Sequence, residues 1–315
     1  MKLFIQSEDI LFENNKWICD TFKEEFIQYS NINIINTTNN MDNSDIIWIL
    51  APWNINTEFK NKIKSSQKVI TTIHHIDHFK YIDFLKYYDN IKDITTYYHV
   101  PCSKTEKELR KITDKKIVVQ NFWINDKIYF HIENKDELRI KYNIPNNKII
   151  IGSFQKDTEG KNKCMKPKLS KGVDILVNIL NDFNNYKDIF VVLTGRRRNY
   201  IINKLNENEI PYCYFEMISY KELNELYNCL DLYIVSSRIE GGPRSIMESA
   251  LCKVPIISTN VGVSELILSN ESIYDTEQYL TYKNSKPNVK YAYQKVLKYT
   301  ISNDYINEFT NKVFM

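Results

Sequence analysis

Two glutamates flank a predicted helix start within residues 230–266. Glu240 lies in the polar loop 236–243, and Glu248 lies about one turn inside the helix predicted over residues 244–253. A helix start carries unpaired backbone N–H groups and the positive end of the helix dipole, so it favours an anion such as phosphate. Because a carboxylate repels phosphate, each glutamate needs another partner, and hydroxyl groups fit. A phosphate between two polyhydroxyl groups describes a nucleotide sugar.

The loop between the glutamates is suited to this role. Gly241 and Gly242 let the backbone approach a ligand closely. Pro243 suits a first helical turn, where its missing N–H costs no hydrogen bond. With Arg244, which begins the helix, these residues complete the predicted anion site. Apolar runs at residues 230–235 and 255–258 predict a buried strand on each side.

The same stretch resembles the family 4 (group 1) retaining glycosyltransferases. The resemblance rests on S-x-x-E-G-x-P-x-x-x-x-E-x-x-x-C-x-V-P-I-I-x-T, and continues through Gly262 and Glu265. It implies that Glu240 contacts the hydroxyl groups of the donor sugar and that Glu248 contacts the ribose. It also implies the GT-B fold, in which two doubly wound Rossmann-like α/β domains face each other across a cleft.

The resemblance extends to a basic position and a Lys-Gly pair after the strand predicted over residues 148–154. Lys156 and Lys171 occupy these places, and the resemblance implies that they neutralise a diphosphate. Lys156 stands where arginine is commoner, so it lacks the bidentate fork. The donor-side residues implied in addition are Gly152, Gly195, Arg196, Met217 and Ile218. Residues 196–198 are all arginines. One of them could reach the base or the diphosphate of the donor, and the competing interpretation is a helix start exposed to solvent.

The segment 157–170 is longer and more basic than the corresponding link in the family. Its lysines are Lys161, Lys163, Lys166 and Lys168. The simplest interpretation is a solvated, mobile loop. A lid over the donor and a contact with anionic lipid stay as alternatives.

Candidate acceptor-side residues follow two strands of the N-terminal half. Trp53 offers a flat apolar platform. His74 and His78 have the spacing of metal ligands, but no further Cys or His pair is placed to complete a closed site. The resemblance instead implies a histidine near the reacting carbon of the sugar. We assign this catalytic role to His74, with His75 as the alternative because the register is open; a histidine that is only hydrogen-bonded locally is the other interpretation.

Alternating strands and helices predict a parallel sheet in each half. Strands are expected at residues 3–5, 33–35, 45–50, 69–73, 93–99 and 117–119, and helices at 17–29, 57–64, 79–88 and 103–111, the last with a capping box at Ser103. We expect an N-terminal, acceptor-side domain over 1–130, a linker region over 131–147 and a nucleotide-sugar domain over 148–285. Residues 286–315, with a helix over 291–314, should pack back on the first domain.

Composition narrows the function class. The chain has 315 residues and a net charge of +3, and its basic residues form no stripe interleaved with aromatics, so a nucleic-acid partner is disfavoured. The 6 cysteines include no C-x-x-C pair, which favours a reducing compartment. No apolar run approaches the about 18 residues that span a bilayer. We expect a soluble, cytoplasmic protein; a peripheral membrane contact and the oligomeric state stay open.

The resemblance to the family 4 glycosyltransferases implies a retaining glycosyltransferase that moves a sugar from a nucleotide-diphosphate sugar to a hydroxyl acceptor, on a glycan, a lipid-linked sugar or a protein-linked sugar. No cofactor and no metal is expected, since lysines are present and a D-x-D motif is absent. A catalytically silent nucleotide-sugar-binding protein of the same fold is the main alternative. A sugar-nucleotide epimerase is a further one. The G-x-G-x-x-G signature of dinucleotide binding is absent.

Overall fold

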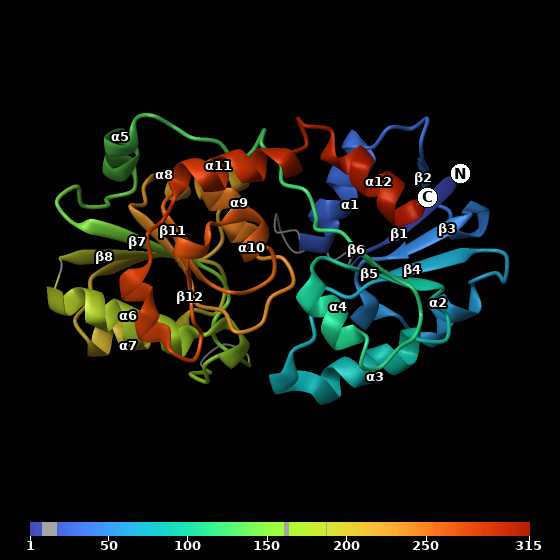
Figure 1. The fold of residues 1–315 in the computed structure, drawn as a ribbon, viewed down its shortest axis with the longest axis horizontal. Coiled ribbons are helices and arrows are strands. Elements are labelled where there is room, and N and C mark those ends of the chain that lie inside the picture. The colour runs from blue at the N-terminus through green and yellow to red at the C-terminus, as the bar shows by residue number, and fades with distance from the viewer. Residues whose placement is uncertain (8–17, 161–163, 187) are drawn as a thin grey trace. The chain divides into compact units, whose positions relative to one another are not determined.

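A computed structural model describes residues 1–7, 18–160, 164–186 and 188–315 of the chain. The chain forms two compact units, coloured in chain order in Figure 1. Unit 1 comprises Met1–Trp123 and Asp304–Met315, and unit 2 comprises Ile124–Asn303. Trp17, Lys161 and Lys163, which carried predictions, lie outside the described residues.

Unit 1 is built on a six-stranded parallel sheet with the strand order β2-β1-β3-β4-β5-β6. Its central strands are buried along nearly their whole length, because helices cover both faces of the sheet. The strands are β1 (Lys2–Gln6), β2 (Asn36–Thr38), β3 (Ile46–Ile49), β4 (Lys68–Thr72), β5 (Tyr97–Val100) and β6 (Ile117–Val119). The α-helices are α1 (Ile18–Tyr29), α2 (Thr57–Asn61), α3 (Tyr81–Ile91), α4 (Ser103–Leu109) and α12 (Tyr305–Phe314).

Alternate residues of β3 face two different cores in unit 1. Ile47 and Ile49 join an apolar cluster that includes Phe84 of α3 and Leu109 of α4. Trp48, between them, faces an aromatic cluster that α1 and α12 supply: its ring lies 5.4 Å from Phe26 and 5.1 Å from Phe314. The C-terminal helix α12 is therefore part of the core of unit 1.

Unit 2 is a second six-stranded parallel sheet, with the order β12-β11-β10-β7-β8-β9. The chain runs outward from β7 to β9 on one side and then from β10 to β12 on the other. The strands are β7 (Ile149–Phe154), β8 (Ile189–Thr194), β9 (Tyr212–Phe215), β10 (Leu232–Val235), β11 (Ile256–Thr259) and β12 (Ile273–Tyr274). The α-helices are α5 (Lys135–Lys141), α6 (Val173–Tyr186), α7 (Asn199–Glu207), α8 (Tyr220–Asn228), α9 (Arg244–Leu251), α10 (Ser264–Ile267) and α11 (Val289–Val296).

The second sheet is also covered on both faces (Figure 1). Ile150 and Tyr233 belong to the core formed with α8, α9 and α11. Their neighbours Ile151 and Ile234 belong to the core formed with α6 and α7. This alternation follows from the two-residue period of a strand. Two doubly wound parallel sheets with flanking helices are the predicted architecture, which is confirmed.

Three local predictions were wrong. The strand expected at 33–35 begins at Asn36, because Asn31 forms a turn in which its side chain accepts from the Asn33 N–H at 2.9 Å. Ser103 is the first residue of α4 rather than its cap, so it forms no capping box. The helix expected over 291–314 is broken: Asp304 has a left-handed backbone (φ 60°), and α11 and α12 lie on either side of the break.

The boundary between the units differs from the predicted linker. The chain passes from unit 1 to unit 2 after Trp123. Residues 131–147 belong to unit 2, where the backbone N–H of Ile132 donates to Asn228 at 2.8 Å. Arg139 of α5 is buried and donates to Asp231 at 2.7 Å. These polar contacts hold the segment against the second sheet.

Candidate functional site

The strand order of unit 2 reverses between β7 and β10. In open α/β sheets, ligands bind beyond the carboxyl ends of the strands at such a reversal. β7 ends at Phe154 and β10 ends at Val235. The loops that follow them, residues 155–172 and 236–243, carry the lysines and Glu240.

These two loops are bonded to each other. The backbone N–H groups of Arg238 and Ile239 both donate to the Ser170 carbonyl, at 2.8 and 3.1 Å. Gly172 ends the turn with a left-handed backbone (φ 58°), and a Cβ there would lie 1.8 Å from the Ser236 carbonyl oxygen. Only glycine permits this approach. The Lys-Gly pair is thus required for the packing of Lys171 beside the loop after β10.

Lys171 and Glu240 form an ion pair at this place. Their side chains are 20% and 11% exposed, so the pair is largely shielded from water. The Ser237 hydroxyl donates to the same carboxylate oxygen of Glu240 at 3.1 Å. On the outer side of the turn, Arg238 binds Asp174 with two hydrogen bonds of 2.7 Å. The carboxylate and the ammonium are therefore held in fixed positions before any ligand binds.

Two further lysines lie near this pair. Lys156 is half-buried and follows β7 by two residues. Lys168, which the sequence analysis assigned to a solvated loop, is also half-buried. Burial is the main cause that lowers the pKa of Lys168 to about 8; the cations of Lys171 and Lys156 add to it, and Glu240 opposes it. In the sequence, only the position of Lys168, three residues before Lys171, could have indicated that it lies near the Lys171–Glu240 pair.

Glu248 lies on the buried side of α9. It is 7% exposed, accepts from the Tyr227 hydroxyl at 2.7 Å and lies 3.4 Å from Nε of Arg244. Burial raises the pKa of Glu248, while Arg244, Tyr227 and Tyr129 favour its ionised form. The predicted contact of Glu248 with a ribose stays a prediction. The tyrosines that hold it were not foreseen.

The loop 241–243 is fixed from a second direction. Gly262 has a left-handed backbone (φ 52°), and a Cβ there would lie 2.5 Å from Cδ of Pro243 and 2.7 Å from the Gly241 carbonyl. Pro243 stands at the N-cap position just before α9, rather than in its first turn, and makes no side-chain capping bond; Gly242 is exposed. The family-like glycine at 262 therefore has a packing reason.

The remaining donor-side residues follow β8 and β9 or lie within β7. Gly195 donates to the Glu216 carbonyl at 3.0 Å, which brings it beside Met217. Met217 and Arg196 are exposed, and Ile218 is half-buried. Gly152 packs against Leu230 within the sheet. The structure thus places Gly195, Arg196, Met217 and Ile218 in neighbouring loops at the carboxyl edge.

Arg198 contradicts the interpretation of residues 196–198 as a solvated helix start. Its guanidinium is fully buried, and Nε lies 2.5 Å from the equally buried Asp157 carboxylate. It also donates to the carbonyls of Ser153 and Thr194 at 2.5 and 2.7 Å. Asp157 begins the basic segment, so this segment is anchored at its start rather than solvated throughout.

In unit 1, the ring of His74 lies next to the exposed ring of Trp53. The rings of Trp53, which is 43% exposed, and His74 are 5.8 Å apart. Nε2 of His74 lies 2.8 Å from the Leu50 carbonyl, so this nitrogen carries the proton, and Phe122 stacks on the ring. Burial lowers the pKa of His74 to about 4, which keeps the imidazole neutral near pH 7.

His75 and His78, which follow His74 in the sequence, are in different environments. His75 is half-buried, and His78 is exposed with Nε2 3.3 Å from a Glu108 oxygen. Within residues 1–7, 18–160, 164–186 and 188–315, no three His, Cys, Asp or Glu side chains are grouped to hold a metal ion.

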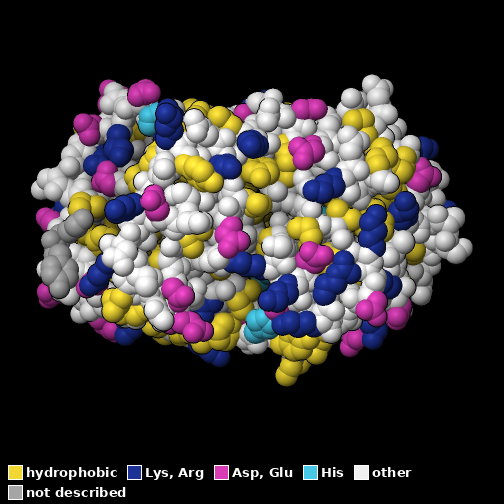
Figure 2. Space-filling view, in the orientation of Figure 1, with side chains coloured by type: hydrophobic (Ala, Val, Ile, Leu, Met, Phe, Trp, Pro, Cys, Tyr) yellow, Lys and Arg dark blue, Asp and Glu magenta, His cyan; other side chains and the backbone are white. Residues whose placement is uncertain are grey.

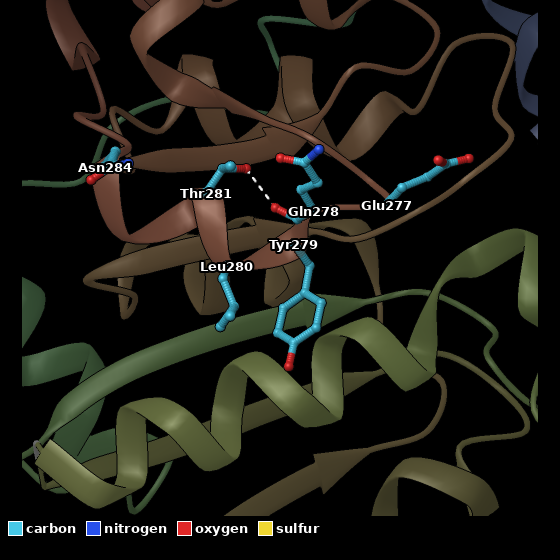
Figure 3. Close-up of a pocket in the computed structure, with 6 residues that line it drawn as sticks. All are labelled: Glu277, Gln278, Tyr279, Leu280, Thr281 and Asn284. Atoms are coloured by element: carbon cyan, nitrogen blue, oxygen red, sulfur yellow. Dashed lines mark hydrogen bonds between the residues drawn. The ribbon is translucent and has the colours of Figure 1, made fainter.

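Two hollows of unit 2 lie apart from these residues. One is lined by six residues from Glu277 to Asn284, where the Thr281 hydroxyl donates to the Gln278 carbonyl at 2.8 Å (Figure 3). The other, of about 620 Å³, is lined by residues at the amino ends of the strands, among them Ile149 and Leu232. Neither contains a predicted site residue.

The two doubly wound parallel sheets match the fold of GT-B glycosyltransferase structures. Residues 165–294 match the family model described as glycosyl transferases group 1, so the predicted resemblance is confirmed at the level of group 1 for this part of unit 2, while the family 4 subtype and the retaining mechanism stay predictions. The match includes Lys168, Lys171, Glu240 and Glu248. No match was found among curated proteins.

Solved structures share the fold of nearly the whole chain. Anabaena HepE, solved in complex with UDP-glucose, has a TM-score of 0.71 at 11% identity, over 98% of each chain. A glycosyltransferase from Rickettsia africae has a TM-score of 0.67 at 17% identity, over 98% of this chain and 96% of that one. Sucrose-phosphate synthase from Thermosynechococcus elongatus has a TM-score of 0.67 at 14% identity, over 85% and 72%.

The surface shows no separation of charge on the face drawn in Figure 2, where basic and acidic side chains are interspersed. Near α4, for example, Arg110 pairs with Glu106 at 3.3 Å and Lys111 pairs with Glu108 at 2.6 Å. None of the helices in the described ranges is long and apolar enough to cross a bilayer.

Proposed function

We propose that the protein is a retaining glycosyltransferase that moves a sugar from a nucleoside-diphosphate sugar to a hydroxyl acceptor. The observation that carries this proposal is the Lys171–Glu240 ion pair at the strand reversal between β7 and β10. The family match over residues 165–294 and the UDP-glucose complex of HepE support it.

The charges of the site suit departure of a diphosphate. As the bond to the sugar breaks, negative charge grows on the leaving oxygen and positive charge grows on the sugar ring. Lys156 and Lys171 should stabilise the negative charge on the leaving oxygen. Such preorganised groups lower a barrier without rearranging in the transition state. Glu240 should bind sugar hydroxyls and stabilise the positive charge on the sugar ring.

In the structure, Lys171 and Glu240 balance each other's charge. Lys171 donates to Glu240, so neither group is buried without a partner. A donor would exchange this contact for two others, since its phosphate would accept from Lys171 and its sugar would donate to Glu240. Because the lysines supply positive charge at the diphosphate, we propose that the reaction needs no metal ion.

We propose that the reaction retains the anomeric configuration by attack on the side from which the diphosphate leaves. The departing phosphate oxygen then takes the proton of the acceptor hydroxyl as the new glycosidic bond forms. For His74, the bond from Nε2 to Leu50 leaves Nδ1 as the hydrogen-bond acceptor of the neutral ring. We propose that it orients a sugar hydroxyl.

A donor screen tests this function. Binding raises the melting temperature in proportion to the logarithm of ligand concentration over Kd, so the true donor should stand out among UDP-, GDP- and ADP-sugars. Addition of hydroxyl acceptors should then release nucleoside diphosphate and form a glycoside. Stabilisation without release in the presence of any acceptor indicates the catalytically silent binder. No stabilisation by any nucleotide sugar contradicts both.

A further inference from the structure

The basic segment that begins at Asp157 has a fixed path at both of its ends. At its start, the Asp157 carboxylate meets Arg198, and both side chains are fully buried. At its return, the backbone N–H of Lys168 donates to the Asp157 carbonyl at 2.7 Å. Between them, Thr158 and Pro167 form an antiparallel bridge. The position of Lys168 is therefore set by a buried ion pair.

Lys168 and Lys171 belong to one turn. The backbone N–H of Lys171 donates to the Lys168 carbonyl at 2.9 Å, and residues 169–171 form a 3₁₀ turn. This bond closes the turn, so Lys168 and Lys171 lie close together at its two ends. Lys171 pairs with Glu240 there. Lys168 thus stands over the same carboxyl edge of the sheet.

The charges around Lys168 are unbalanced. Its ammonium is half-buried and interacts with the cations of Lys171 and Lys156 and with the carboxylates of Glu240 and Glu159. Glu240 is engaged by Lys171. Within the part of the chain that the structure describes, three lysines, with Lys168 itself, thus stand against two carboxylates in a partly desolvated place, where a further anion would be stabilised.

We propose that Lys168 is a third phosphate-binding residue of the donor site, and that it takes up a proton when a nucleoside diphosphate binds. The proposal rests on the proposed function and deepens it. Because the pKa of Lys168 is about 8, the side chain is about half protonated at pH 8 before binding. A bound diphosphate would favour the charged form, so binding at pH 8 should take up about half a proton.

Calorimetric titration of the full-length protein with UDP, GDP and ADP tests this. Proton uptake is obtained at pH 8 from the heats measured in buffers of different ionisation enthalpy. Lys168→Met should lower the affinity for the nucleoside diphosphate about 10- to 100-fold, which is the range for loss of a hydrogen bond to a charged group. It should also remove the proton uptake. Lys168→Arg should keep the affinity within a few-fold yet also remove the uptake, because arginine is always charged.

Lys166→Met is the matched control, since Lys166 is an exposed lysine of the same segment. It should leave affinity and proton uptake unchanged. If the wild type binds a nucleoside diphosphate and Lys168→Met binds it equally well, or if Lys168→Arg still takes up the proton, the role of Lys168 is wrong while the proposed function stands. If the wild type binds none of the three nucleotides, both are wrong. Should Lys168→Met not fold, Lys168→Arg decides the question.

Discussion

Lys171 donates to a carboxylate oxygen of Glu240, although the two residues come from different loops that follow β7 and β10. The contact joins the group that should bind the phosphate to the group that should bind the sugar. Under the proposed function, the ion pair holds both side chains beside the bond between phosphate and sugar.

Glu240→Gln should reduce kcat/KM for transfer by about 100-fold or more, since it removes the charge that stabilises the sugar cation. The affinity for UDP or another nucleoside diphosphate should stay the same or rise, because Lys171 is released for the phosphate. Product formation and calorimetric titration measure the two effects. Glu271→Gln, at an exposed glutamate of the same unit outside the family-like motif, is the control. Full transfer activity of Glu240→Gln would show that Glu240 has another role.

Arg198→Met should destabilise unit 2 by about 3–5 kcal/mol, because it leaves the Asp157 carboxylate buried without its cation. The double variant Asp157→Asn with Arg198→Met should cost less than the sum of the single variants. Urea unfolding followed by circular dichroism gives these values. Asp174→Asn breaks the more exposed pair with Arg238 and should cost about 1 kcal/mol or less. An equally small effect of Arg198→Met would contradict the anchoring of the segment.

Unit 1 should lose stability as the pH falls below about 6.5. His99 is fully buried between the Gln120 carbonyl and the Thr72 hydroxyl, and burial lowers its pKa to about 3. The unfolded chain therefore binds a proton that the native state does not, and at pH 5 this linkage removes about 2 kcal/mol. The loss of stability is absent above the pKa that His99 has in the unfolded chain, and it is nearly complete at the pKa that His99 has in the folded protein. His74 adds to it in the same direction.

The change can be followed in unit 1 alone, since all 4 tryptophans lie in residues 1–123. Tryptophan fluorescence in urea at pH 7 and pH 5 should show a smaller difference for His99→Gln than for the wild type. His78→Gln, at an exposed histidine, should behave as the wild type. An undiminished difference in His99→Gln would assign the pH dependence to other groups.

A chelator should leave transfer unchanged, because under the proposed function Lys156 and Lys171 supply the positive charge at the diphosphate. Rates measured with EDTA and with added Mg²⁺ or Mn²⁺ test this. Loss of activity with EDTA that either metal restores would mean that the lysines do not suffice.

The sequence predicted what depends on local pattern. Apolar, β-branched runs gave the central strands of both sheets. The motif around Glu240 gave a strand, a loop and a helix in the correct order. Such features need only neighbours along the chain.

What the sequence did not predict depends on long-range pairing. Asp157 and Arg198 are 41 positions apart, and Tyr227 and Glu248 are 21 apart. Charged side chains usually face water, so the sequence favoured solvated positions for Arg198 and Lys168. Burial of a charge depends on a partner that only the fold supplies.

The central claim is that a diphosphate binds beyond β7 and β10 between Lys171 and Lys156, with Glu240 on the sugar side. A crystal structure of the full chain with UDP tests it most directly. The account predicts the β-phosphate within hydrogen-bond distance of the Lys171 ammonium, with the Lys171–Glu240 contact opened. UDP bound elsewhere, with the Lys171–Glu240 pair intact, would contradict it.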